Sequence, residues 1–360
     1  MEFRATSNKQ QARIATFVAQ MLSIVANFAA LEDVDTRLKS KFQQRLLLEK
    51  LVKDHKDRPF FLRHLRMSYD SFTILLNQIR EHVDIADEQM GSLRGGKIIP
   101  ELHLYATICY LAGASYSDVC LFCGISVPSF YCIIWRTINA INKAINISFP
   151  STVQECAVLA AGFENISRHG VIKNCVGAVD GYLLAIATPW KSHAKNVCSY
   201  FSGHYQKYGI NIQASCNAHC CFTFLGIGGP GVTKDRNGIK ESGLFDKVEN
   251  LPAGYVCIAD CTYQPTENLA PIFGGDLALR KDNDNFNFFA SQLRIRIEMA
   301  FGIMTRKWGI LQHPLTSSLF SMKHIICCIG RLHNFCIEEC LKNATANVTS
   351  TLTTLYLLIS

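Results

Sequence analysis

The hydrophobic pattern of this chain changes near residue 170, and this change limits the folds it can adopt. Before that point apolar residues recur at helical spacing, and after it they alternate or run together as in β-strands. Strand-like runs cover 174–188, 208–216, 221–227 and 255–259, and helical patterns return at 238–251 and 291–310. Such an order is typical of an α/β or α+β domain. We therefore expect one after a boundary near residues 150–170.

The first half of the chain is predicted to be helical. Helices are expected over 14–57, 68–83, 100–113, 115–123 and 127–145. Gly124-Ile125-Ser126 separates the last two as a tight turn whose serine can cap the second helix. This is the pattern of a helix-turn-helix, and the residues that would contact DNA are Ser129, Tyr131, Arg136 and Asn139. A plain helical bundle uses the same turns and caps, so the pattern alone leaves both interpretations open.

The excess of basic residues is concentrated in one stretch. The 360 residues carry a net charge of +7, and residues 37–66 contain ten basic residues against three acids, which is also +7. A localised basic stretch indicates a polyanionic partner such as nucleic acid or a membrane surface. With 49% hydrophobic and 18% charged residues, the composition excludes extensive disorder. We expect residues 1–58 to form a basic helical arm.

The sixteen cysteines do not indicate a secreted disulfide scaffold, which would be a small chain with a signal peptide. Many lie in apolar runs, where a thiol behaves as a small hydrophobe, so we expect a reducing compartment. Cys120 and Cys123 have zinc-like spacing but lack a second ligand pair, and His219, Cys220 and Cys221 share a predicted strand. Polar residues interrupt the apolar stretch 14–31, which predicts a buried or amphipathic helix and leaves a mitochondrial presequence open.

Three acids occupy positions that disfavour a lone carboxylate. Asp180 lies in the middle of the first predicted strand, Asp260 directly follows the fourth, and Glu298 lies among apolar residues of the last helix. Convergent carboxylates suit hard cations such as Mg²⁺, and two such ions can activate a water or a 3′-hydroxyl for phosphodiester cleavage. Two simpler interpretations stay open. Glu298 could form a helix pair with Arg294, and Asp180 could lie in a turn before Gly181.

Eight short motifs follow one another between about residues 60 and 340. They are Leu65-Arg-Met-Ser68 with Phe72; Ile99-Pro-Glu-Leu102 through Leu111-Ala-Gly-Ala-Ser-Tyr116 to Gly124-Ile-Ser126; Gly177-Ala-Val-Asp-Gly181; Asn211-Ile-Gln213; Pro230-Gly231 with Asp235; Ile258-Ala-Asp260 with Tyr263; Arg294 with Glu298-Met-Ala-Phe-Gly302; and Leu332-His-Asn-Phe335. In this order they resemble the PIF/Harbinger-type transposases, DDE enzymes of the Harbinger transposase-derived nuclease-like family.

The resemblance implies a fold and a set of catalytic acids. It implies an RNase H-like catalytic domain at 166–340, with a mixed sheet and flanking helices, after an all-α domain at 59–165 whose helix-turn-helix covers about 102–146. Asp180, Asp260 and Glu298 fall on the family's metal-binding acids, which implies DNA cleavage and joining with two Mg²⁺ or Mn²⁺ ions. Asp235 falls on a recurrent family aspartate and is the rival second acid. We prefer Asp260, because it ends a strand beside the central one.

The resemblance also implies partners and a location. It implies DNA ends and target DNA as substrates, a Myb/SANT-like protein partner, a homo-oligomer, no membrane, and the nucleus, or the cytoplasm without that partner. Candidate phosphate contacts are Arg294, Arg296, Arg306 and Lys307. The chain departs from the family at Asn217, at Tyr182-Leu183 and in a divergent tail, 341–360. The alternatives are a domesticated, noncatalytic DNA-binding protein and an unrelated helical interaction module.

Overall fold

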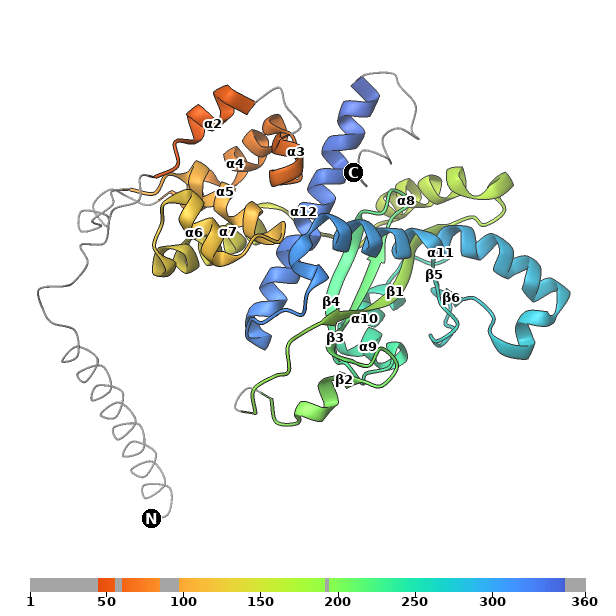
Figure 1. Ribbon diagram of the computed structural model, residues 1–360. Coiled ribbons are helices and arrows are strands. Elements are labelled where there is room, and N and C mark those ends of the chain that lie inside the picture. Colours follow the sequence, from red (N-terminus) through yellow and green to blue (C-terminus); the bar gives the residue numbers. More distant parts are fainter. Residues whose placement is uncertain (1–44, 56–59, 85–96, 192–193, 347–360) are drawn as a thin grey trace, which may run out of the picture. The chain divides into compact units, whose positions relative to one another are not determined.

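A six-stranded mixed sheet forms the centre of the computed structural model, which describes residues 45–55, 60–84, 97–191 and 194–346 (Figure 1). Its strands are β1 (Cys175–Ala185), β2 (Phe201–Ser202), β3 (Lys207–Cys216), β4 (Phe222–Pro230), β5 (Val256–Ala259) and β6 (Leu269–Pro271). The strand order is β2-β3-β1-β5-β6, and β4 also pairs with β3. β1 is antiparallel to β3 and parallel to β5, so the central strand joins an antiparallel half to a parallel half.

Helices precede the sheet and cover it. The α-helices are α2 (Leu48–His55), α3 (Phe60–Leu65), α4 (Tyr69–Val83), α5 (Pro100–Leu111), α6 (Tyr116–Cys123), α7 (Val127–Ala144), α8 (Val153–Ile166), α9 (Asp235–Glu241), α10 (Leu244–Glu249), α11 (Lys281–Lys307) and α12 (Leu319–Ala346). The 3-10 turns are η3 (Arg168–Gly170), η4 (Val197–Tyr200), η5 (Gly275–Leu279) and η6 (Gly309–Gln312). One apolar core includes residues from α2 to α12 and from the sheet, so the predicted boundary near 150–170 stays a prediction.

The predicted helix starts and central strands are confirmed. Ser68, Ser115 and Ser126 each accept a hydrogen bond from the third residue of the helix that follows, which satisfies one of the free amides of the first turn. Gly124 has a φ of 65°, the left-handed conformation that glycine adopts easily, and α6 and α7 meet at 101° around it. The expected helix over 14–57 is observed only as α2, because residues 1–44 lie outside the described residues.

Several elements differ from the prediction. The helix expected at 238–251 is two helices, α9 and α10, which are separated at Gly243 with a φ of 80°. The helix expected from 291 begins at Lys281. His219, Cys220 and Cys221 lie in the turn between β3 and β4, where the Asn217 side chain accepts hydrogen bonds from two backbone amides, so their assignment to a strand is wrong.

The long helix α12 is attached to the start of β4 by two polar side chains. The Asn334 side chain accepts a hydrogen bond from the Phe222 N–H and donates one to the Phe222 carbonyl, both at 2.7 Å. His333 Nε2 lies 2.8 Å from the Cys220 carbonyl oxygen. Both side chains are buried. Through these hydrogen bonds the Leu332-His-Asn-Phe335 motif of α12 holds this helix against β4, a strand at the edge of the sheet.

The cysteines and the apolar helices can be described within the residues that the structure covers. All sixteen cysteines lie in the described part of the chain, and all are free thiols. Within that part, no single helix is long and apolar enough to cross a membrane, although the bent pair of α6 and α7 passes that test when taken together.

Candidate active site

Asp180 lies in the middle of β1, so the alternative that placed it in a turn is wrong. Its side chain is 20% exposed, and its Oδ1 accepts a hydrogen bond of 2.8 Å from the Gly181 N–H. The pKa of Asp180 is raised to about 7, chiefly by burial and in smaller part by the carboxylates of Asp235 and Asp260, against the opposite effect of the Gly181 N–H and Arg294. Three carboxylates therefore act on one another at this point of the sheet.

Asp260 reaches this point through the register of two parallel strands. Val179 pairs with Ala259, so the next residue of each strand, Asp180 and Asp260, comes at the same level of the sheet. The sequence predicted that Asp260 ends a strand beside the central one, and β5 does end at Ala259 beside β1.

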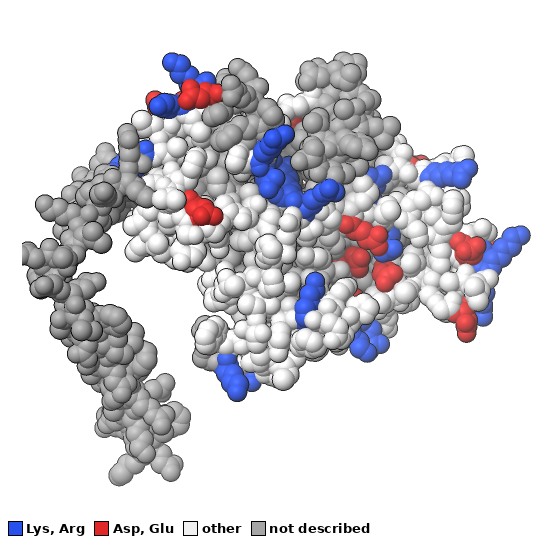
Figure 2. All heavy atoms as spheres, in the orientation of Figure 1, with Lys and Arg blue, Asp and Glu red and all other residues white. Residues whose placement is uncertain are grey.

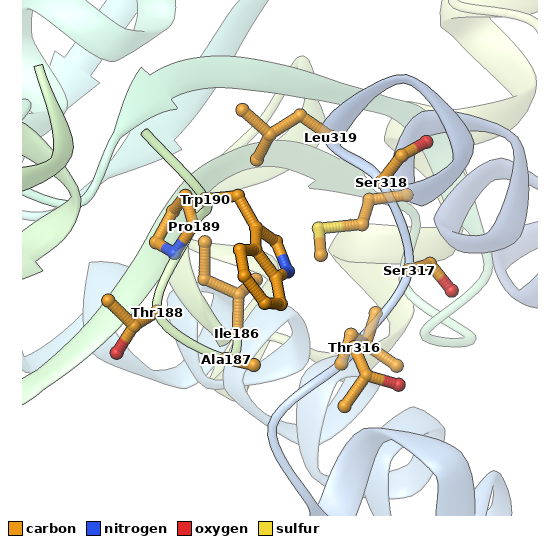
Figure 3. Close-up of a pocket in the computed structure, with 11 residues that line it drawn as sticks. Ile186, Ala187, Thr188, Pro189, Trp190, Thr316, Ser317, Ser318 and Leu319 are labelled. Carbon is orange, nitrogen blue, oxygen red and sulfur yellow. The ribbon is translucent and has the colours of Figure 1, made fainter. Parts of the chain in front are cut away.

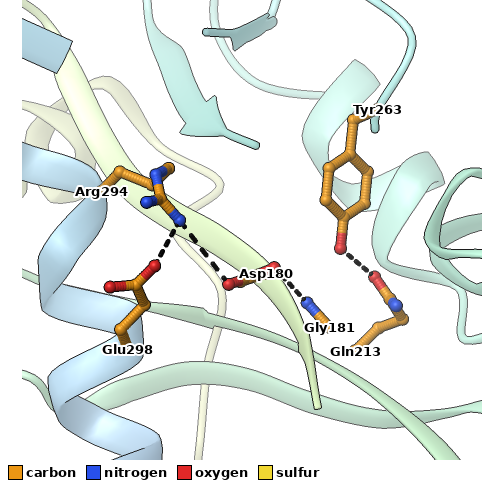
Figure 4. Close-up of polar contacts among 6 residues, drawn as sticks. All are labelled: Asp180, Gly181, Gln213, Tyr263, Arg294 and Glu298. Carbon is orange, nitrogen blue, oxygen red and sulfur yellow. Dashed lines mark hydrogen bonds and ion pairs between the residues drawn. The ribbon is translucent and has the colours of Figure 1, made fainter. Parts of the chain in front are cut away.

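Arg294 lies between Asp180 and Glu298 (Figure 4). Its Nη1 is 2.6 Å from Glu298 Oε1 and 3.9 Å from Asp180 Oδ2. The pair between Arg294 and Glu298, which the sequence left open as a simpler interpretation, is therefore present. The contact with Asp180 connects α11 to β1. A second connection between these two elements is the stacked pair of Tyr182 and Phe301, whose ring centroids are 5.2 Å apart.

Glu298 is more exposed than its apolar neighbours in the sequence suggested. Its side chain is 47% exposed, whereas Ile297 and Phe301 on the same helix are buried. The expectation that Glu298 occupies an apolar setting is wrong, because it lies on the side of α11 that faces away from the core. Figure 2 shows acidic side chains gathered over α11 and β1 with basic side chains close by.

Asp235 is the first residue of α9 and is held by two amide side chains. Its Oδ1 accepts hydrogen bonds of 3.0 Å from Asn211 Nδ2 and from Gln213 Nε2. The Tyr263 hydroxyl donates a hydrogen bond of 2.7 Å to Gln213 Oε1, and both residues are buried. This network, Asp235-Asn211-Gln213-Tyr263, connects the start of α9 to the loop that follows Asp260.

Sequence reasoning missed this network. Asn211 and Gln213 were noted only as a motif, although residues two apart on a strand point to the same face. Gly181 is opposite Gln213 in the sheet, and a Cβ added at Gly181 would overlap Asp235 Oδ1. Gly181 therefore leaves room for the Asp235 carboxylate.

The chemistry of these side chains fits a divalent cation. All four candidates, Asp180, Asp235, Asp260 and Glu298, offer carboxylate oxygens, the ligands that hard cations prefer, and Arg294 already places a positive charge between two of them. In their present positions, no three His, Cys, Asp or Glu side chains of the described residues are close enough to hold a metal ion. Asp180 and Glu298 can share a cation only after Arg294 has moved away from them.

One family model matches the part of the chain that carries these acids. Residues 179–334 match the family model described as DDE superfamily endonuclease. The matched segment contains Asp180, Asp235, Asp260 and Glu298, and it ends at Asn334. It supports a DDE transposase family, a nuclease function on DNA and, as is general in this superfamily, the use of divalent metal ions. The mixed sheet with flanking helices fits an RNase H-like DDE domain. The curated proteins and the solved structures contain no match.

The residues predicted to read DNA all lie on α7. Ser129 is at its first turn and shares a hydroxyl contact of 2.8 Å with the capping Ser126. Tyr131 is 48% exposed, and its ring stacks on that of Tyr116 from α6. Asn139 is exposed, and Arg136 is half-buried. The exposed members therefore share one helix that begins directly after the turn.

The basic residues predicted on α11 have different surroundings. Arg306 is exposed, whereas Arg296 and Lys307 are half-buried. Arg296 lies beside the Cys220 thiol and Lys307 beside the Cys336 thiol; burial raises the pKa of each thiol, and these cations oppose that rise. Arg306 is therefore the most accessible of the four candidates for a phosphate, and Arg294 is paired with carboxylates.

Proposed function

We propose that this protein is a DNA transposase of the PIF/Harbinger type, an endonuclease that cleaves and joins phosphodiester bonds with two Mg²⁺ or Mn²⁺ ions. One observation carries the proposal. Asp180 and Asp260 lie at the same level on neighbouring parallel strands, and Glu298 approaches Asp180 from α11 through the shared Arg294. All three lie within the segment that matches the DDE superfamily endonucleases.

Asp180, Asp260 and Glu298 would hold the metal ions, which supply a polarised water or 3′-hydroxyl and stabilise the leaving oxygen. The chain's own contribution is positional. The sheet fixes Asp180 and Asp260, the Gly181 N–H orients the Asp180 carboxylate, and α11 carries Glu298. Arg294 neutralises two acids in the free protein. Once released from Glu298, its guanidinium is close enough to the same site to contact a DNA phosphate.

Asp260 is our second catalytic acid, and Asp235 is the rival. Asp235 Oδ1 already accepts two hydrogen bonds from buried amides, so we assign Asp235 a positioning role next to Asp180. Asp260 makes no side-chain hydrogen bond or ion pair with the residues that the structure describes, which leaves its oxygens available to an ion.

DNA recognition would use the helices before the sheet. The 101° angle between α6 and α7 is within the range of helix-turn-helix pairs, and the basic stretch 37–66 would follow phosphates. We include a Myb/SANT-like protein partner, a homo-oligomer and a nuclear location in the proposal, on the resemblance alone. Removing the basic residues of 37–66 should flatten the salt dependence of DNA affinity, and an unchanged slope would argue against this role.

A domesticated, noncatalytic DNA-binding protein is the second candidate. The observation in its favour is Arg294, whose charge occupies the space between Asp180 and Glu298. That protein would bind DNA without cutting it in the presence of metal ions.

Nicking of supercoiled plasmid DNA in Mn²⁺ tests the proposal. The wild-type protein should nick the plasmid, Asp260→Asn should abolish nicking, and the matched Asp235→Asn should retain part of it, because an asparagine oxygen can still accept from Asn211 and Gln213. Nicking that persists in Asp260→Asn and disappears in Asp235→Asn would exchange the two assignments. Tight binding by a wild-type protein that never nicks would favour the noncatalytic alternative.

A further inference from the structure

Trp190 is a large aromatic side chain that lies outside the apolar core. It is 76% exposed, in the loop that follows β1, whereas Trp308 is fully buried. It lines a pocket whose walls are the segments 186–190 and 315–319 together with Met322 of α12. Figure 3 shows its indole between these two segments. An exposed indole over a pocket offers a flat surface on which another ring can stack.

The two walls are fixed to each other by the backbone. The Ala187 N–H donates to the Leu315 carbonyl at 2.9 Å, and the Leu315 N–H donates to the Ala185 carbonyl at 3.0 Å. Ser318 caps the start of α12 by accepting from the Ser321 N–H at 3.2 Å. The pocket is therefore formed before anything binds to it, so a ligand would not have to order it.

The charge around this pocket suits a polyanion. Both walls belong to stretches without any Asp or Glu: residues 181–234 contain four lysines and no acid, and residues 299–337 contain four basic residues and no acid. Lys191, Lys323 and Arg306 from these stretches are exposed. The two stretches are joined by a bridge between Ile186 and Leu315, in the walls of the pocket that Trp190, the one exposed tryptophan of the described residues, also lines. A protein surface of this charge attracts phosphates.

The pocket lies along the path from the candidate active site. Asp180 and Ile186 are six residues apart on one extended chain, which is about 20 Å at a rise of about 3.3 Å per residue. Each strand of duplex DNA carries one phosphate per about 3.4 Å of helix axis, so this length corresponds to about six nucleotide steps along a duplex. A strand held at Asp180 is long enough to reach Trp190 within a few nucleotides of the bond to be cut.

We propose that Trp190 and this pocket form a base-stacking subsite for an unpaired nucleotide of the DNA strand. Stacking on Trp190 supplies affinity that does not depend on sequence. Lys191 and Lys323, which follow the lining residues Trp190 and Met322 in the chain, would hold the backbone. This inference rests on the proposed function, because it needs DNA as the substrate. It adds a site that is separate from the carboxylates.

The test measures binding in EDTA, where no cleavage occurs, by fluorescence anisotropy with two labelled 20-mers. One is oligo(dT) and the other has the same phosphates but abasic sugars, so the pair separates stacking from charge. Trp190→Ala should weaken oligo(dT) binding by about 5- to 150-fold, the range for one stacked base, and leave abasic binding unchanged. Trp190→Phe should retain most of the affinity. Leu279→Ala, at a side chain that is 82% exposed in η5, is the matched control and should change neither.

The possible results distinguish failure of the Trp190 subsite from failure of the proposed function. If the wild type binds both 20-mers and Trp190→Ala binds oligo(dT) as tightly as the wild type and Leu279→Ala do, the subsite is refuted and the proposed function is untouched. If the wild type binds neither 20-mer, the subsite is refuted, whereas the proposed function is decided separately by plasmid nicking in Mn²⁺. Trp190→Ala should keep the wild-type melting temperature, because its side chain is outside the core.

Discussion

Replacing Tyr263 with phenylalanine should destabilise the fold through a single lost hydrogen bond. The Tyr263 hydroxyl donates to Gln213 Oε1 at 2.7 Å, and the two residues are 3% and 0% exposed, so water cannot take its place. Leaving a buried acceptor without its donor costs about 1–3 kcal/mol. Urea denaturation should report a free energy of unfolding lower by this amount. The matched variant Tyr255→Phe, at a half-buried tyrosine whose hydroxyl bonds to none of the described residues, should unfold like the wild type.

A double-mutant cycle tests whether this bond helps to hold Asp235. Gln213 uses its oxygen for Tyr263 and its nitrogen for Asp235, so the effects of Tyr263→Phe and Asp235→Ala should not add. We expect a coupling free energy of about 0.5–3 kcal/mol, the range for residues in one hydrogen-bond network. Effects that add to within about 0.3–0.5 kcal/mol, or a Tyr263→Phe protein as stable as Tyr255→Phe, would refute the connection.

Three further predictions concern buried charge and space. Burial lowers the pKa of His333 to about 4, so the unfolded chain takes up a proton below its ordinary value of 6.5 while the folded chain does not. The free energy of unfolding should therefore fall by about 2 kcal/mol from this group between pH 6.5 and pH 5. Urea denaturation of His333→Gln should show a shallower fall, and an equal fall would contradict the assignment. Arg294→Gln should bind Mn²⁺ roughly tenfold more tightly by calorimetry, because a competing cation is gone; the control Arg306→Gln should match the wild type, and weaker binding by Arg294→Gln would be contrary to our account. Gly181→Ala should lose about 1–3 kcal/mol of stability because its Cβ overlaps Asp235, whereas Gly203→Ala, which has open space around it, should lose none; equal stability of the two variants would remove Asp235 from this contact.

The local parts of the fold were predictable from the sequence because the signals are local. The serines at 68, 115 and 126 fix where three helices begin, since each side chain bonds to an amide only three residues ahead. The start of α8 was equally readable. Thr152 and Glu155 form a capping box, a pattern visible in the sequence that the prediction did not use.

The arrangement of the candidate site was predictable only in part. The position of Asp180 inside a strand and of Asp260 after its neighbour followed from the apolar runs around them. The exposure of Glu298 did not, because it depends on which side of α11 faces the sheet. The contact of Arg294 with Asp180 joins residues 114 positions apart (294 minus 180), and the Tyr263 contact with Gln213 joins residues 50 apart. Such pairs arise from tertiary packing, which a pattern of nearest neighbours does not contain.

The position of Mn²⁺ in crystals of the protein is the most direct test of the central claim that Asp180, Asp260 and Glu298 form a metal-dependent catalytic centre. Anomalous scattering identifies manganese by itself, without relying on activity. We expect a peak between the Asp180 and Asp260 carboxylates, with Glu298 turned toward it and Arg294 displaced from both acids. A peak at Asp235 instead would correct the choice of second acid. A site that stays occupied by Arg294 at saturating Mn²⁺, with no metal near Asp180, would contradict the account.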